Sequence, residues 1–158
     1  MSKFDELDGF NQLHGYWLED LTVGQVAVTS RTITEAAVEL FGGISGDLNP
    51  THFSDDFAKK EIFGKRIVHG MLTMSHITGS LASKLPGPGC LYLSQNTKFI
   101  APVNIGDTVT TVITVTKIGE PNKRGMAQVT LKTDQFVGDN QCVDGEALLL
   151  VVSKTKKK

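Results

Sequence analysis

Hydrophobic side chains recur at helical spacing between positions 69 and 85, and small residues occupy the faces between them. The large apolar residues of this stretch are Met71, Leu72, Met74, Ile77, Leu81 and Leu85. The small residues are Ser75, Gly79, Ser80, Ala82 and Ser83. Because almost no charge occurs before Lys84, the pattern predicts a long helix that is buried on nearly all sides.

The chain after position 89 is dominated by alternating and β-branched residues, which favour strands. Strands are predicted over residues 90–99, 108–118, 126–136 and 142–153. The continuous apolar run at 148–152 is typical of a central strand that is covered on both faces. A further alternating stretch, at 24–33, predicts a strand ahead of the long helix.

One long apolar helix combined with several antiparallel strands indicates an α+β fold. The helix is apolar on too many faces to lie on one side of a flat sheet. The best arrangement is therefore a sheet wrapped around a central helix, the hot-dog fold. We predict one such domain over residues 22–153. Residues 1–21 are expected to form an N-terminal arm laid on its surface, and residues 154–158 a basic, solvated tail.

Two shorter helices are predicted between the first strand and the long helix. Thr34 can cap a helix whose first turn contains Glu35, and the pair Gly42 and Gly43 is expected to end it. Ser54 can cap a second helix that begins with two acidic residues and ends with two lysines. That charge distribution suits the helix dipole.

Composition excludes several classes of function. The 158 residues are 40% hydrophobic and 21% charged, as in a soluble globular domain. Lys and Arg total 16 against 17 Asp and Glu, so no nucleic-acid partner is expected. No apolar run reaches the roughly 18–20 residues that span a membrane, and the N-terminus lacks the apolar region of a signal peptide. Cys90 and Cys142 lie far apart without a CxxC spacing, which favours free thiols and a cytoplasmic location.

The stretch at 44–52 carries the chemistry. It places a carboxylate, Asp47, and an imidazole, His52, five positions apart, with Asn49 and Pro50 between them. An acid and a base on a stiff turn can both hydrogen-bond one water molecule and move its proton. Proline restricts both its own backbone and that of Asn49. Asp, Asn and Pro are also common turn residues, so local turn chemistry alone explains the same stretch.

The motif Ser45-Gly46-Asp47-Leu48-Asn49-Pro50-Thr51-His52, followed by Ile67-Val68-His69-Gly70-Met71, resembles the MaoC-like family of (R)-specific enoyl-CoA hydratases. The family pattern Gly-Asp-x-Asn-Pro-x-His is matched without a departure. The Leu-Pro-Gly-Pro-Gly run at 85–89 and the segment at 99–107 also look like family positions. The resemblance covers residues 22–152.

The resemblance implies a hot-dog homodimer or higher homo-oligomer that interconverts trans-2-enoyl-CoA and (3R)-3-hydroxyacyl-CoA in fatty-acid or hydroxyacyl metabolism. It implies that Asp47 and His52 are catalytic and that the Gly70 amide binds the thioester oxygen. Asn49, Pro50 and Thr78 are expected to have supporting roles. No cofactor is implied, because CoA is part of the substrate. A metal site is not expected, since no HExxH or Cys/His cluster accompanies the histidines.

Several alternatives remain open from the sequence. The substrate carrier is either CoA or acyl-carrier protein, and a hot-dog thioesterase or a non-catalytic acyl-binding module would share the fold. His69 is expected to cap or pack at the start of the long helix. Four cations are candidates for contacts to the CoA phosphates, although solvated surface charge is the better explanation of any single one. These cations are Lys65, Arg66, Lys84 and Lys98.

Overall fold

The computed structural model describes residues 1–155; the last three residues of the predicted basic tail, 156–158, lie outside the described part. Its helices are α1 (Lys3–Glu6), α2 (Gly9–Leu13), α3 (Glu35–Ser45), α4 (Pro50–Phe53), α5 (Asp55–Ala58) and α6 (Gly70–Ser83), with a 3-10 turn, η1, at Leu18–Asp20. Its strands are β1 (Val26–Thr32), β2 (Leu91–Phe99), β3 (Thr108–Ile118), β4 (Met126–Val137) and β5 (Asn140–Val152).

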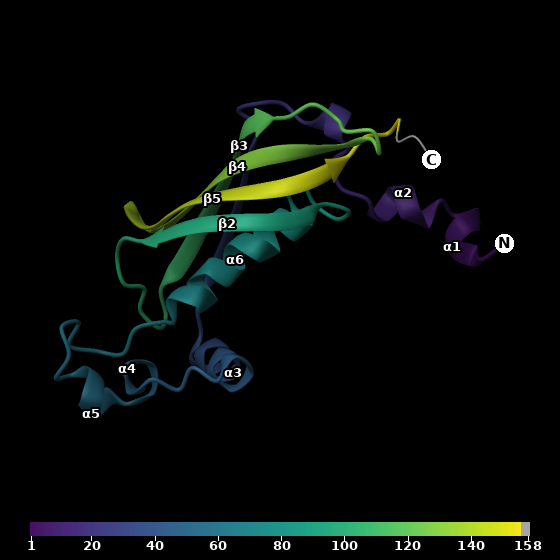
Figure 1. The fold of residues 1–158 in the computed structure, drawn as a ribbon. Helices are drawn as coiled ribbons and strands as arrows, with labels where there is room; N and C mark the ends of the chain where they lie inside the picture. Colours follow the sequence, from purple (N-terminus) through teal and green to yellow (C-terminus); the bar gives the residue numbers. More distant parts are fainter. Residues whose placement is uncertain (156–158) are drawn as a thin grey trace.

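The five strands form one antiparallel sheet in the order β1-β3-β4-β5-β2, and α6 lies along its inner face (Figure 1). Side chains of α6 meet side chains of the central strands in the core, where Ile77 and Leu81 join Ile113, Leu131 and Leu149 with at most 2% exposure. The predicted α+β fold with a sheet around a central helix is confirmed. No helix within residues 1–155 is long and apolar enough to cross a membrane.

The prediction that α6 is buried on nearly all sides is wrong for the single chain. Leu72, Ile77 and Leu81 are buried, but Met71 and Thr78 are exposed on the opposite face. The small residues of α6 allow close approach on its buried side. They do not force burial of its other side, because only one sheet covers the helix.

Helix α3 continues past the glycines that were expected to end it. It ends at Ser45, and Gly46 adopts the left-handed conformation (φ 75°) that closes the helix. Gly42 is buried inside the helix, where a Cβ atom would lie 2.4 Å from the ring of Phe53. The glycine at 42 therefore serves a close approach between α3 and α4 rather than a helix end.

The outer face of β5 is less covered than the apolar run at 148–152 predicted. Leu149 and Val151 are buried in the core, whereas Leu148 and Leu150 are half-buried on the other face. The predicted strand is confirmed, but its full coverage on both faces is wrong for the single chain.

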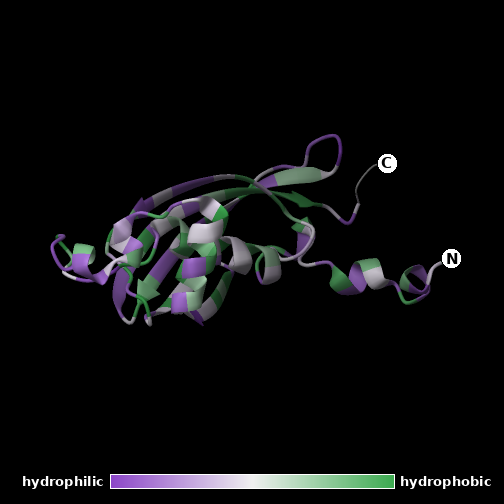
Figure 2. Cartoon of the chain, turned by 90° about the horizontal axis from the view of Figure 1, so that it is seen from below, coloured by the Kyte–Doolittle hydropathy of each residue, from purple (hydrophilic) through white to green (hydrophobic). Residues whose placement is uncertain are grey.

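The N-terminal arm does not lie flat on the domain. Helices α1 and α2 bury no residue, and they project away from the sheet with hydrophilic and hydrophobic positions intermixed (Figure 2). The arm is attached further along, where the Gly15 and Tyr16 amides donate to the carbonyls of Pro88 (2.8 Å) and Pro86 (2.7 Å). Lys154, at the start of the basic tail, is paired with Asp20 next to this attachment.

Candidate active site

The turn between α3 and α4 is fixed by short-range hydrogen bonds that suit its residue types. The Asp47 amide donates to Ser45 Oγ (3.2 Å), and the Asn49 amide donates to Asp47 Oδ1 (3.3 Å). Asn49 caps α4 by accepting from the Thr51 amide (3.1 Å), and Pro50 takes the first helical position. The supporting residues therefore hold one oxygen of the Asp47 carboxylate and leave Oδ2 available.

His52 is placed on α4 with its ring buried and oriented. Its Nδ1 lies 2.8 Å from the Ile67 carbonyl oxygen, which can only accept a hydrogen bond. Nδ1 therefore carries the proton in the neutral ring, and Nε2 is left as an acceptor. Nε2 lies 4.0 Å from Asp47 Oδ2. The Asp47 side chain is 52% exposed, so the pair is open to a small molecule on the carboxylate side.

Gly70 begins α6 and shares a cavity with His52. The cavity has a volume of 320 Å³, and most of its wall is apolar. Its lining residues are His52, Phe63, Ile67, Val68, Gly70, Thr73, Phe99, Ile100, Ala101, Pro102, Val103, Cys142 and Val143. As the first residue of the helix, Gly70 has an amide that is not needed for the helical ladder. A base and a free amide at a helix N-terminus therefore face one apolar space.

A side chain at position 70 would crowd its neighbour. A Cβ atom on Gly70 would lie 3.0 Å from two ring carbons of Phe99. Phe99 ends β2 and forms part of the same cavity. Glycine at this position therefore lets the ring approach the start of α6.

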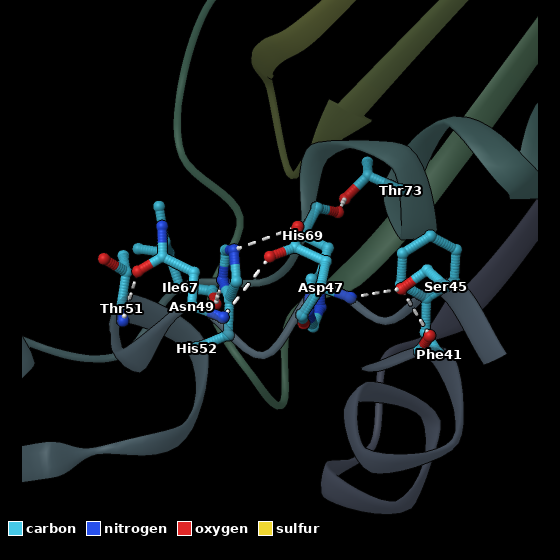
Figure 3. Close-up of polar contacts among 9 residues, drawn as sticks. All are labelled: Phe41, Ser45, Asp47, Asn49, Thr51, His52, Ile67, His69 and Thr73. Carbon is cyan, nitrogen blue, oxygen red and sulfur yellow. Dashed lines mark hydrogen bonds and ion pairs between the residues drawn. The ribbon is translucent and has the colours of Figure 1, made fainter. Parts of the chain in front are cut away.

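His69 is the residue whose position the sequence did not reveal. Its ring is 1% exposed and lies 3.8 Å from the ring of His52, with an angle of 30° between the planes. Its Nε2 lies 2.9 Å from the Asp47 backbone carbonyl, as Figure 3 shows. The expected packing role is present, but the side chain makes no helix-capping hydrogen bond. The only sequence signal was its place next to Gly70 in the second motif.

Asp47, His52 and His69 also form a group whose ligand atoms lie within 4.8 Å of one another. They fit a metal ion poorly. Zinc bonds of about 2.0–2.1 Å place tetrahedral ligands about 3.3 Å apart, whereas Asp47 Oδ2 and His52 Nε2 are 4.0 Å apart. His69 Nε2 is already bonded to a carbonyl. That the site works without a metal or cofactor stays a prediction.

The remaining candidates lie elsewhere or have other partners. Thr78 is exposed two turns along α6, near the Tyr92 hydroxyl, and it does not line the 320 Å³ cavity. Its supporting role stays a prediction. Arg66 is bonded to both Glu35 and Asp55, which makes it a poor candidate for a CoA phosphate. Burial raises the pKa of the Cys142 thiol, so this cavity residue is not a ready nucleophile.

A second cavity, of 420 Å³, lies on the other side of α6 between α3 and β1. Leu40, Phe41 and Ile44 provide its apolar wall, and the wall from α6 includes Ser75 and His76. It contains none of the predicted catalytic residues. Within the described chain, the 320 Å³ cavity is therefore the better candidate for the reacting group.

A model of the MaoC like domain matches residues 21–136. This chain belongs to the MaoC-like domain family. The match begins at the last residue of the predicted N-terminal arm and includes the turn that carries Asp47 and His52. Cys142 and Val143, which also line the 320 Å³ cavity, lie beyond its end.

Relatives and solved structures in the MaoC-like family agree with this assignment. The chain is 42% identical to an (R)-specific enoyl-CoA hydratase of Rhodospirillum rubrum, over 88% of this chain and 94% of that protein. It is 39% identical to a 3-hydroxybutyryl-CoA dehydratase of Methylorubrum extorquens, over 90% of this chain and 88% of that protein. The (R)-hydratase from A. caviae involved in PHA biosynthesis is 40% identical, with a TM-score of 0.76, covering 83% of this chain and 97% of that one.

The comparisons confirm the family, the hot-dog fold and the hydro-lyase class that the two motifs predicted. They do not test the roles of individual residues. In this MaoC-like domain the structure brings Asp47 next to His52, and His52 and Gly70 line the same cavity.

Proposed function

We propose that this protein adds water to trans-2-enoyl-CoA and removes it from (3R)-3-hydroxyacyl-CoA, with Asp47 and His52 as the catalytic pair. The observation that carries the residue assignment is the free Nε2 of His52, which lies 4.0 Å from Asp47 Oδ2 and belongs to the cavity that contains Gly70. The names of the relatives at 39–42% identity support the substrate class.

The separation of the two acceptors suits one bridging water. A water oxygen about 2.8 Å from each acceptor makes a normal hydrogen bond with both. With the acceptors 4.0 Å apart, the angle at that oxygen is about 90°, near the angle between the two O–H bonds of water. Such a water donates both hydrogens and keeps a lone pair free for attack on the β-carbon.

The proton balance follows from this arrangement. As the water oxygen bonds to the β-carbon, one O–H bond breaks and its proton passes to Asp47, while His52 Nε2 keeps hold of the other hydrogen. The electrons of the double bond move onto the thioester as an enolate. Asp47 then returns the proton to the α-carbon, so the enzyme ends in its starting state. Dehydration is the same sequence in reverse.

The Gly70 amide is assigned to the enolate oxygen. It is at the N-terminus of α6, where unbonded amides and the helix dipole favour negative charge. One donor of this kind typically contributes on the order of 3–4 kcal/mol at a transition state. The apolar walls of the cavity exclude water and strengthen that interaction.

The functional unit is proposed to be a homodimer. In the single chain β2 is an edge strand, and its Leu91, Leu93 and Phe99 are exposed together with Met71 on α6. An open edge with apolar side chains favours association. A fully active monomer in sedimentation would contradict the dimer while leaving the reaction unaffected.

The reaction is tested by adding crotonyl-CoA and following enoyl absorbance, with chiral analysis of the 3-hydroxybutyryl product. We expect loss of the enoyl band and the (3R) product. Release of free thiol without loss of that band would identify a thioesterase instead. The same assay with crotonyl-acyl-carrier protein determines the carrier, and CoA is the expected one.

The residue assignment is tested by Asp47→Asn and His52→Ala, each of which should lower kcat by about 10²-fold or more, the usual scale for a positioned acid or base. Asp56→Asn is the matched control, because Asp56 is an exposed carboxylate of α5 that pairs with Lys59 across 3.6 Å. Normal turnover in either site variant would remove that residue from the mechanism.

A further inference from the structure

His69 occupies a closed aromatic setting directly behind the catalytic pair. Its ring centroid lies 3.8 Å from that of His52, 5.1 Å from that of Phe41 and 5.5 Å from that of Phe53. Its side chain is absent from the wall of the 320 Å³ cavity. At 1% exposure, His69 can touch neither a substrate in that cavity nor solvent. Any effect on the reaction must pass through its neighbours.

The hydrogen bond of His69 determines its tautomer. Nε2 lies 2.9 Å from the Asp47 carbonyl oxygen, and a carbonyl accepts, so Nε2 donates. Nδ1 is then an acceptor, and it is buried with no hydrogen-bond partner within residues 1–155. Since Nδ1 makes no bond, the Nε2–H donor is the one polar function that this ring performs.

That donor acts on the backbone from which the catalytic carboxylate extends. The Asp47 carbonyl is held by His69, and the Asp47 carboxylate is held at Oδ1 by the Asn49 amide. The same His69 ring supports the face of the His52 ring, whose other constraint is the bond from Nδ1 to the Ile67 carbonyl. One buried side chain therefore contacts both members of the pair.

We propose that His69 is a positioning residue, which sets the distance between Asp47 Oδ2 and His52 Nε2 by bonding the backbone of the first and packing its tilted ring against the ring of the second. This inference rests on the proposed function of that pair. A bridging water tolerates little change in their 4.0 Å separation. A misplacement of about 1 Å in a catalytic geometry can cost on the order of 10²-fold in rate.

The test uses two substitutions that separate the hydrogen bond from the packing. His69→Phe keeps an aromatic ring of similar size among the same neighbours and removes the donor. His69→Gln loses the ring but retains an amide N–H that can reach the Asp47 carbonyl. For crotonyl-CoA hydration we expect kcat of His69→Phe to fall by about 10–10²-fold with little change in KM. His69→Gln should recover part of that loss.

His76→Phe is the matched control. It makes the same exchange at a half-buried histidine inside α6, which lines the 420 Å³ cavity and not the 320 Å³ cavity. It should keep the wild-type kcat. Unchanged kcat in His69→Phe would overturn the proposal. An equal loss in both His69 variants, in proportion to a loss of thermal stability, would also overturn it, since that result describes packing alone.

The tautomers of the histidine rings can be measured without substrate, and they test the positioning role of His69 separately from the proposed hydratase reaction. In ¹⁵N spectra of the wild-type histidine rings, His69 should be the Nε2–H tautomer and His52 the Nδ1–H tautomer. In His69→Phe, the ring ¹⁵N signals of His52 should shift, while the backbone amide spectrum should remain that of a folded protein. His69 found as the Nδ1–H tautomer would overturn the positioning role. A wild-type protein that shows the expected tautomers but does not hydrate crotonyl-CoA would instead contradict the proposed reaction.

Discussion

Replacing Arg66 by methionine should loosen the two helices that flank the catalytic turn. The Arg66 guanidinium donates from Nη1 and Nη2 to Glu35 (2.6 and 3.1 Å) and from Nε to Asp55 (2.8 Å). Glu35 is in the first turn of α3 and Asp55 in the first turn of α5. These bonds raise the pKa of Arg66 further above its ordinary value, so the side chain is permanently charged. Arg66 therefore joins the segments before and after Asp47 and His52.

The size of the effect follows from the bonds and their exposure. A net charge-assisted hydrogen bond contributes about 1.5–3 kcal/mol when well buried, but exposed ion pairs contribute only about 0.2–1 kcal/mol. The Arg66 side chain is 21% exposed, whereas Glu35 and Asp55 are 46% and 67% exposed, so each bond belongs near the lower range. Three such bonds give about 2 kcal/mol, or a fall in Tm of roughly 4–8 °C for a domain of this size.

The assay is urea unfolding of Arg66→Met beside the control Lys59→Met. Lys59 also pairs with an acid of α5, Asp56, but at 3.6 Å and with both side chains strongly exposed. The control should change the free energy of unfolding by no more than about 0.5 kcal/mol. The Arg66 variant should also lose crotonyl-CoA turnover, because the turn is less well held. If both variants lose the same stability, the reasoning from bond number and exposure is wrong.

Three further predictions concern the core, the site and pH. Leu149→Ala, at a fully buried position, should lower the free energy of unfolding by about 2–5 kcal/mol. A loss of less than about 1 kcal/mol in thermal denaturation would contradict the placement of Leu149 in the core. Gly70→Ala must displace the ring that lies 3.0 Å from its new Cβ and should raise KM or lower kcat, whereas Gly79→Ala meets nothing within 4 Å and should leave both unchanged. Burial lowers the pKa of His76 below 6.5 in the folded chain. At a pH just below 6.5 the unfolded chain therefore binds more protons than the folded chain, and the free energy of unfolding falls as the pH drops. His76→Gln should reduce this loss, and parallel curves of unfolding free energy against pH would contradict it.

The strands were predictable because their residues have local preferences that the sheet satisfies. The β3 strand was predicted and found at Thr108–Ile118, where valine, isoleucine and threonine suit a pleated surface. The end of α3 was not predictable from local rules. Gly42 looks like a helix end in the sequence, but it is glycine because a side chain there would collide with the ring of Phe53. Close contact between two helices thus overrides the usual meaning of a glycine.

The sequence by itself determined the fold class, the family and the choice of Asp47, His52 and Gly70. Helical and strand periodicities are local, and a motif at fixed spacing is visible without coordinates. Only the tertiary structure decided that His52 Nδ1 bonds the Ile67 carbonyl and that the His69 ring contacts both Asp47 and His52. Those contacts join residues 15 to 22 positions apart, across the loop that precedes α6. Their geometry depends on how that loop folds back, which no local propensity specifies.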